Sequence, residues 1–224
     1  MNYLYLLLES FVVFIFLYLF NKRGKKEGLF IYIGFMASLL SVVMFKLINI
    51  ISFPINFGLP IVMGIFTANN IIIQRYGLDE VKKIISYFGI CYVSTIAIIC
   101  LCSFVNSNEY DVITNNAFNN IFGYNLINVR IFIGELLSMG FMLWYNGEVY
   151  YYIRKNKNSL LFSNIGSMLV IQFIESLIFI IISYSGIYDI IMLFGMIVVR
   201  YLIKVLIGVV GLVPVMLVNR VKGK

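Results

Sequence analysis

The stretch IIMLFGMIVVRYLIKVLIGVVGLVPVML, from Ile190 to Leu217, is a continuous apolar run that contains two cations, Arg200 and Lys204. As an α-helix it is longer than the roughly 30 Å hydrocarbon core of a bilayer requires. Lys204 then falls near the middle of the bilayer, and Arg200 lies one turn away on the same face. A cation at that depth costs about 2.5 to 3.5 kcal/mol on insertion scales. We therefore expect anionic or polar partners from neighbouring helices, or a water-filled cavity.

The composition of the whole chain is that of a polytopic membrane protein. Its 224 residues are 62% hydrophobic and only 12% charged, with a mean hydropathy of +0.97, unlike any soluble globular domain. The formal charge of +7 does not indicate a nucleic-acid partner, because most Lys and Arg residues lie in short connections between apolar runs. The runs are continuously apolar and too long for barrel strands, so we predict an all-α fold.

Seven apolar runs are each predicted to be a transmembrane helix. They cover residues 3–20, 29–52, 58–74, 84–105, 127–152, 162–183 and 190–217. Basic residues follow the first, third, fifth and seventh runs, whereas the connections at 53–57, 106–126 and 184–189 contain no Lys or Arg. The positive-inside rule then places the N-terminus outside and the C-terminus in the cytoplasm. The first run lacks a preceding basic region and a cleavage site, so we expect a retained helix and no signal peptide.

Polar side chains inside four of these runs are the candidate substrate-binding residues. The argument rests on Glu175, Arg200 and Lys204, because buried ion pairs are often no more stabilising than apolar replacements, and a cavity explains them better than packing does. Structural interpretations exist for others, since Arg130 could snorkel to the interface and the amides could form interhelical hydrogen bonds. The full set is Asn70, Gln74, Arg130, Glu135, Asn146, Gln172, Glu175, Arg200 and Lys204.

These residue types favour binding over catalysis. The chain has no histidine, so zinc hydrolysis of the usual kind and a serine with a histidine base lack their groups. It has no Gly-rich phosphate loop with Lys and Ser or Thr, so it is not expected to hydrolyse ATP by itself. Cys91, Cys100 and Cys102 fall in one run and are expected to be reduced core residues. No enzyme activity, cofactor or metal is expected. Carboxylates, amides and a guanidinium facing one cavity suit a flat, polar, hydrogen-bonding solute.

At these residues the sequence resembles the queuosine precursor transporters, also called the VUT or YhhQ family, from about Gly24 to Lys222. The family's Asp-x-x-x-Glu-x-Tyr-Gly signature corresponds to the stretch from Asn70 through Gln74 to Gly77, after Leu59-Pro60. A later Arg-Ile stretch is matched loosely at Arg130-Ile131 and then at Asn146. The helix that carries Ser-Thr, Gln and Asp in the family is matched by Ser167, Gln172 and Glu175, and Lys204 lies ten residues before Pro214.

The resemblance implies a single transmembrane helical domain over 1–224, with an extra N-terminal helix at 1–23 and a six-helix core at 24–222. It also implies an importer that binds a 7-deazaguanine base in a central cavity and carries it across the cytoplasmic (inner) membrane of a bacterium without an ATPase. Amides replace family acids at Asn70, Gln74 and Asn146. In such a site Glu175 would accept the ring N–H and amine of the base, while Gln172, Asn70 and Lys204 would donate to its other edge.

Two other functions stay open. The chain could be the substrate-binding membrane subunit of an ATPase-energised vitamin importer, although it lacks the Ala-x-x-x-Ala contact motif usual in such subunits. It could also be a degenerate, non-transporting membrane protein, for which the three replaced acids are the argument. The expected partners are a small-molecule substrate and the lipid bilayer, with no nucleic acid, and a homo-oligomer is left open.

Overall fold

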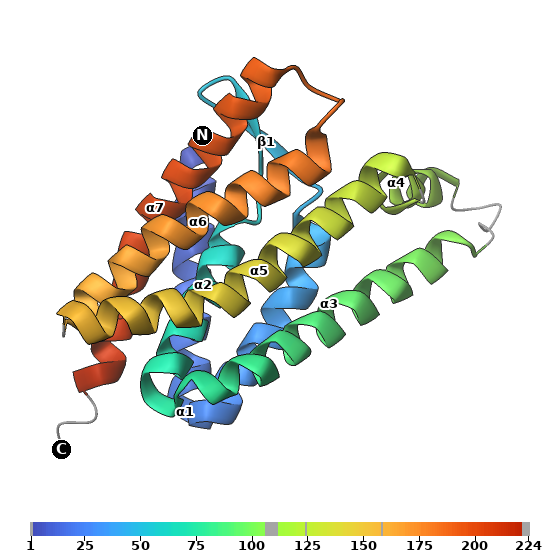
Figure 1. Cartoon of the computed structure of the whole chain (residues 1–224). Helices are drawn as coiled ribbons and strands as arrows, with labels where there is room; N and C mark the ends of the chain where they lie inside the picture. Colours follow the sequence, from blue (N-terminus) through green and yellow to red (C-terminus); the bar gives the residue numbers. More distant parts are fainter. Residues whose placement is uncertain (1, 106–111, 124, 158, 221–224) are drawn as a thin grey trace.

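The computed structural model describes residues 2–105, 112–123, 125–157 and 159–220, most of them helical (Figure 1). An antiparallel hairpin of β1 (Leu47–Ile50) and β2 (Phe53–Asn56) lies between the first two helices, and a short 3-10 turn, η1 (Leu78–Glu80), precedes the third. The helices are α1 (Asn2–Val43), α2 (Leu59–Tyr76), α3 (Val81–Ser103), α4 (Val112–Phe122), α5 (Leu126–Lys157), α6 (Leu160–Tyr184) and α7 (Ile190–Arg220).

Five described helical stretches are long and apolar enough to cross a membrane. Large apolar side chains cover their outward faces, for example Ile90 and Leu101 on α3 and Leu206 on α7, each more than 60% exposed. Such faces fit a hydrocarbon surrounding, in which the helices satisfy their own backbone groups. The prediction of an all-α membrane protein is confirmed. The five stretches are Tyr3–Val43, Leu78–Ser103, Leu126–Asn156, Leu160–Tyr184 and Ile190–Val213.

α1 is bent back on itself at Lys25. That residue has non-helical backbone angles, φ 48° and ψ −117°, and joins two helical segments. The second segment packs along the first, since the Tyr32 hydroxyl donates to the Val13 carbonyl at 3.3 Å and the rings of Phe20 and Tyr32 are 6.1 Å apart. The first two apolar runs therefore form an antiparallel pair, with their basic connection at the bend (Figure 1).

The expectation of one helix over residues 29–52 is wrong. The helix ends at Val43, the rest of the run forms β1 and the hairpin turn, and β2 comes from the predicted connection at 53–57. This segment is rich in β-branched residues, and Pro54 is excluded from a helix interior but tolerated on an edge strand, where it pairs with Asn49. The tip residues Ile51 and Ser52 both have positive φ, 50° and 70°, as tight two-residue hairpins require. We call this end of the bundle the hairpin end.

α2 is the central helix of the bundle. Every residue from Leu59 to Ile73 is buried, and α1, α5 and α7 pack around the helix (Figure 1). A helix buried on all sides is expected to be apolar on all sides, yet α2 carries Asn69 and Asn70. Buried amides need hydrogen-bond partners, so neighbouring helices must supply them.

The remaining helices complete the enclosure of α2. α5 and α6 run antiparallel along each other, and α7 packs on both α6 and α2 (Figure 1). α4 occupies part of the connection at 106–126, and its Ile113 is 86% exposed; residues 106–111 and 124 of that connection lie outside the described part. The arrangement turns the polar faces of α5, α6 and α7 toward one another.

Candidate functional site

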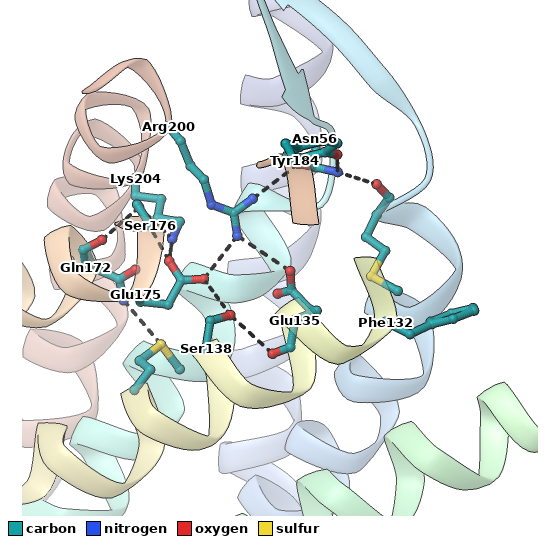
Figure 2. Close-up of polar contacts among 12 residues, drawn as sticks. Asn56, Phe132, Glu135, Ser138, Gln172, Glu175, Ser176, Tyr184, Arg200 and Lys204 are labelled. Atoms are coloured by element: carbon teal, nitrogen blue, oxygen red, sulfur yellow. Dashed lines mark hydrogen bonds and ion pairs between the residues drawn. The ribbon is translucent and has the colours of Figure 1, made fainter. Parts of the chain in front are cut away.

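Four charged side chains from three helices meet inside the bundle. Glu135 comes from α5, Glu175 from α6, and Arg200 and Lys204 from successive turns of α7 (Figure 2). Each is at most 1% exposed. We call these four residues the charged cluster. It contains two carboxylates and two cations, so its formal charge is zero.

Glu175 is the centre of the charged cluster. Its Oε1 accepts from Nη2 of Arg200 at 3.0 Å, and its Oε2 is ion-paired with the Lys204 ammonium. The same Nη2 of Arg200 lies 3.5 Å from Oε2 of Glu135. One guanidinium therefore bridges the two carboxylates, while the two oxygens of Glu175 are held by different cations.

Two serines extend this network. The Lys204 ammonium donates to Oγ of Ser176 at 3.1 Å, and that hydroxyl donates onward to the Gln172 carbonyl at 2.8 Å. The Ser138 hydroxyl donates to Oε1 of Glu175 at 3.4 Å. Because hydrogen bonds of this kind must replace the lost hydration of a buried charge, they make burial of the lysine and the carboxylate tolerable.

The hairpin reaches the charged cluster through one residue, Asn56. Nη1 of Arg200 donates to Oδ1 of Asn56 at 3.4 Å, and Nδ2 of Asn56 donates to the Met44 carbonyl at 2.6 Å and to the Tyr184 hydroxyl at 3.0 Å. The guanidinium carbon of Arg200 also lies 3.9 Å from the centroid of the Phe179 ring, within cation–π range. The hairpin thereby closes the charged cluster at the hairpin end.

A second group of buried polar residues lies farther along the same helices. Asn70 of α2 donates to Oδ1 of Asn164 on α6 at 3.0 Å and accepts from Nδ2 of Asn146 on α5 at 2.6 Å. Asn69 donates to the Leu143 carbonyl of α5 at 3.4 Å. We call Asn69, Asn70, Asn146 and Asn164 the amide layer. All four are at most 3% exposed, and none carries a charge.

Comparison with known proteins identifies the family of this chain. Residues 56–218 match the family model described as "Putative vitamin uptake transporter". The chain belongs to this family of membrane transporters. A relative from Bacillus subtilis (strain 168), named "Probable queuosine precursor transporter", is 26% identical over 206 residues, which cover 91% of this chain and 88% of the relative. The resemblance to queuosine precursor transporters is therefore confirmed. No solved structure matches the chain.

The predicted site residues of this transporter fall into three groups. Glu135, Glu175, Arg200 and Lys204 form the charged cluster, with Gln172 one turn from Glu175 on α6. Asn70 and Asn146 belong to the amide layer. Gln74 is half-buried one turn beyond Asn70, and Arg130 binds the C-terminal end of α6, where it donates to the carbonyls of Ile182 at 3.0 Å and Ser185 at 2.7 Å.

Several polar atoms beside the charged cluster have no hydrogen-bond partner among the described residues. They include Oε1 of Glu135, Oε1 of Gln172 and Nε of Arg200. Gln172 is fully buried, and its Nε2 donates to the sulfur of Met142 at 3.3 Å. The side-chain oxygen Oε1 of Gln172 therefore has no partner. Since buried polar atoms are nearly always paired, these atoms mark where a polar solute or water can bind.

Five residues of this architecture were not singled out from the sequence: Asn56, Asn69, Asn164, Ser176 and Phe179. Asn56 was assigned to a connection, and its role depends on a hairpin that was not expected. Asn164 lies about three helical turns before Glu175, so helical spacing alone could have placed both on one face. Ser176 and Phe179 carry no signal that separates them from ordinary core residues.

Three pockets lined by described residues lie away from the charged cluster. One of about 460 Å³ lies between α1 and α3, beside Gly34. An apolar one of about 360 Å³ lies between α1, the hairpin tip and α7, and one of about 150 Å³ lies beside Trp144. The predicted central cavity is not one of these three. Within the described residues, no three His, Cys, Asp or Glu side chains are grouped to hold a metal ion.

Proposed function

We propose that this transporter imports a queuosine precursor, a 7-deazaguanine base, and binds it beside the charged cluster between α5, α6 and α7. The observation that carries the proposal is the pair of buried, unpartnered acceptors, Oε1 of Glu135 and Oε1 of Gln172, on either side of Glu175 (Figure 2). A guanine-like edge presents a ring N–H and an exocyclic amine, which such oxygens accept. The name of the Bacillus subtilis relative supports this substrate class.

In this proposal Glu135, rather than Glu175, makes the first contact with the base. Both oxygens of Glu175 are already held by Arg200 and Lys204, whereas one oxygen of Glu135 is free. Nε of Arg200 is an unpartnered donor that suits a carbonyl oxygen of the base. Glu175 then acts as a positioning residue, because it fixes both cations. Arg130 and Gln74 are proposed to be structural.

We also propose seven spans, with the N-terminus outside and the C-terminus in the cytoplasm of a bacterium. Two basic connections meet at one end of the bundle, since Lys26 and Lys83 both bind Glu80, at 2.8 and 3.2 Å. The two connections at the hairpin end, residues 44–58 and 185–189, contain a single basic residue, Lys46, and they meet where Asn56 binds Tyr184. This grouping supports the positive-inside assignment.

Ser52→Cys should react with an impermeant thiol reagent added outside, and Lys82→Cys only after the cells are opened; the reverse pattern would contradict the topology.

A vitamin is the second candidate substrate, because the family description names vitamin uptake. In that case the chain would act as the substrate-binding subunit of an importer that borrows an ATPase. The two candidates differ in energy supply. Uptake into proteoliposomes that contain only this chain would favour the queuosine precursor importer, and uptake that requires an added ATPase module would favour the vitamin subunit.

The proposal is tested in a bacterium that lacks both queuosine precursor synthesis and its own precursor transporter. Expression of the chain should restore queuosine in tRNA when a precursor is supplied in the medium. Lys204→Met should abolish the rescue, while Lys46→Met, which removes an exposed lysine from the hairpin end, should leave it intact. Wild-type protein that reaches the membrane and gives no rescue would refute the proposed substrate.

A further inference from the structure

The amide layer and the charged cluster lie on the same faces of two antiparallel helices. Glu135 and Asn146 on α5 are about three helical turns apart, and Asn164 and Glu175 on α6 have the same spacing. Three turns correspond to about 16 Å and return a side chain to nearly the same face. The two polar groups thus lie at two levels along the same pair of helices.

Hydrogen bonds fix which atoms of the amide layer are free. Nδ2 of Asn164 donates to the Leu160 carbonyl, so its Oδ1 is the acceptor for Asn70. Nδ2 of Asn70 is used there, so its Oδ1 accepts from Nδ2 of Asn146. The donors therefore run from Asn146 through Asn70 and Asn164 to the Leu160 carbonyl, and Oδ1 of Asn146, at the start of this chain, has no partner. Nδ2 of Asn69 donates to the Leu143 carbonyl, and Oδ1 of Asn69 is likewise without a partner.

Methionines separate the two levels. Met142 lies one turn from Asn146 on α5, Met168 lies one turn from Asn164 on α6, and Met63 lies two turns before Asn70 on α2. All three are at most 2% exposed. Met63 and Met168 meet at Gly208 of α7, where an added Cβ would overlap Met168. Methionine is flexible, so these side chains can move aside, and such a movement of Met142 breaks the hydrogen bond from Nε2 of Gln172 to its sulfur.

We propose that the amide layer is a second substrate station, separated from the charged cluster by the three methionines. The proposal rests on the proposed function and adds a site to it. The two free atoms, Oδ1 of Asn69 and Oδ1 of Asn146, are both acceptors and come from adjoining helices. The station therefore takes an uncharged, planar heterocycle that presents neighbouring N–H donors.

The absence of charge gives the second station its role. A solute bound beside the charged cluster contacts an ionised carboxylate, and hydrogen bonds to charged groups are about twice as strong as neutral ones. The amide layer offers two neutral acceptors, Oδ1 of Asn69 and Oδ1 of Asn146, without that strength. A solute that reaches it is held weakly enough to leave, so the amide layer governs the rate of passage while the charged cluster governs affinity.

The test uses wild type, Asn146→Leu and Asn69→Leu with radiolabelled 7-deazaguanine as the probe. Equilibrium binding to the purified protein and initial uptake into proteoliposomes are measured on the same preparations. Both variants should lower the maximal uptake rate at least tenfold and leave the dissociation constant within threefold. Asn69 makes a single 3.4 Å hydrogen bond, so Asn69→Leu keeps the test informative where Asn146→Leu fails to fold.

Asn21→Leu is the matched control. Asn21 is a buried amide with an unpartnered Oδ1, but it lies on α1 near the bend, outside both levels. It should change neither affinity nor rate. Folded Asn146→Leu and Asn69→Leu proteins that transport at the wild-type rate would overturn the second station, and so would an equal loss of binding and rate, because one site would then serve both. Wild type that neither binds nor transports the probe overturns the proposed function itself.

Discussion

The Lys204 ammonium is ion-paired with the Glu175 carboxylate across the α6–α7 interface, and neither side chain has any exposed surface. The pair is not isolated, because Arg200 holds the other oxygen of Glu175 and also reaches Glu135. The two partners are therefore unequal. Removing the lysine leaves a carboxylate that still has a cation, whereas removing the carboxylate leaves Lys204 with only Ser176.

Lys204→Met should destabilise the protein less than Glu175→Leu. The first change removes one partner from a network that stays paired, and should cost about 1 to 3 kcal/mol of unfolding free energy. The second leaves a buried cation without a counter-charge, and should cost about 3 to 5 kcal/mol. Thermal unfolding of the purified variants in detergent measures the order. Adding Lys204→Met to Glu175→Leu should recover part of the loss; no recovery would show that the two residues are not energetically coupled.

Arg130→Met should lower stability and leave substrate affinity unchanged. Arg130 donates to two carbonyls at the C-terminal end of α6, where helix carbonyls lack intrahelical partners and attract cations. Losing these bonds should cost about 1 to 3 kcal/mol. Unfolding and 7-deazaguanine binding are measured together. A weaker affinity in a variant of normal stability would show that Arg130 contributes to substrate binding.

Gly195→Ala should displace the hairpin. An added Cβ at Gly195 would overlap the Phe53 ring, and overpacking of this kind costs about 1 to 3 kcal/mol. Gly89→Ala is the control, because nothing lies within 4 Å of a Cβ at that position of α3, and the change should stabilise the helix by about 0.5 to 1 kcal/mol. Thermal unfolding should move in opposite directions for the two variants. A shift of the same sign in both would show that Gly195 does not support the hairpin.

The helices of this fold were readable from the sequence because long apolar runs have few alternatives in a membrane. The exception is the run at 29–52, where hydropathy is uniform but the secondary structure changes at Val43. Hydropathy reports burial in lipid and not backbone conformation, so Pro54 and the β-branched residues before it were the better signal. The hairpin they form positions Asn56, and that residue was missed with it.

The candidate site was only partly readable for a different reason. Charged residues such as Glu175 and Lys204 stand out in an apolar run, because each must have a partner. Their pairing pattern does not follow from sequence, since it depends on which rotamers the packed helices allow. The assignment of Glu175 as the first contact of a base stays a prediction, and we place the base at Glu135 instead, because Arg200 and Lys204 already bind the two oxygens of Glu175. The free oxygen belongs to Glu135.

Glu135→Gln should weaken binding of 7-deazaguanine more selectively than Glu175→Gln does. Glutamine keeps the shape of Glu135 but replaces one acceptor oxygen with a donor, which cannot receive an N–H of the base. Loss of a hydrogen bond to a charged group is worth about 1.5 to 3 kcal/mol, roughly ten- to a hundredfold in affinity. Glu175→Gln should lower affinity and stability together, because it also disrupts the pairs with Arg200 and Lys204.

Glu148→Gln, an exposed position on the same helix as Glu135, should change neither. Binding is measured by equilibrium titration of the purified proteins and stability by thermal unfolding. An unchanged affinity in folded Glu135→Gln would show that Glu135 does not contact the base and that its unpartnered oxygen binds water instead.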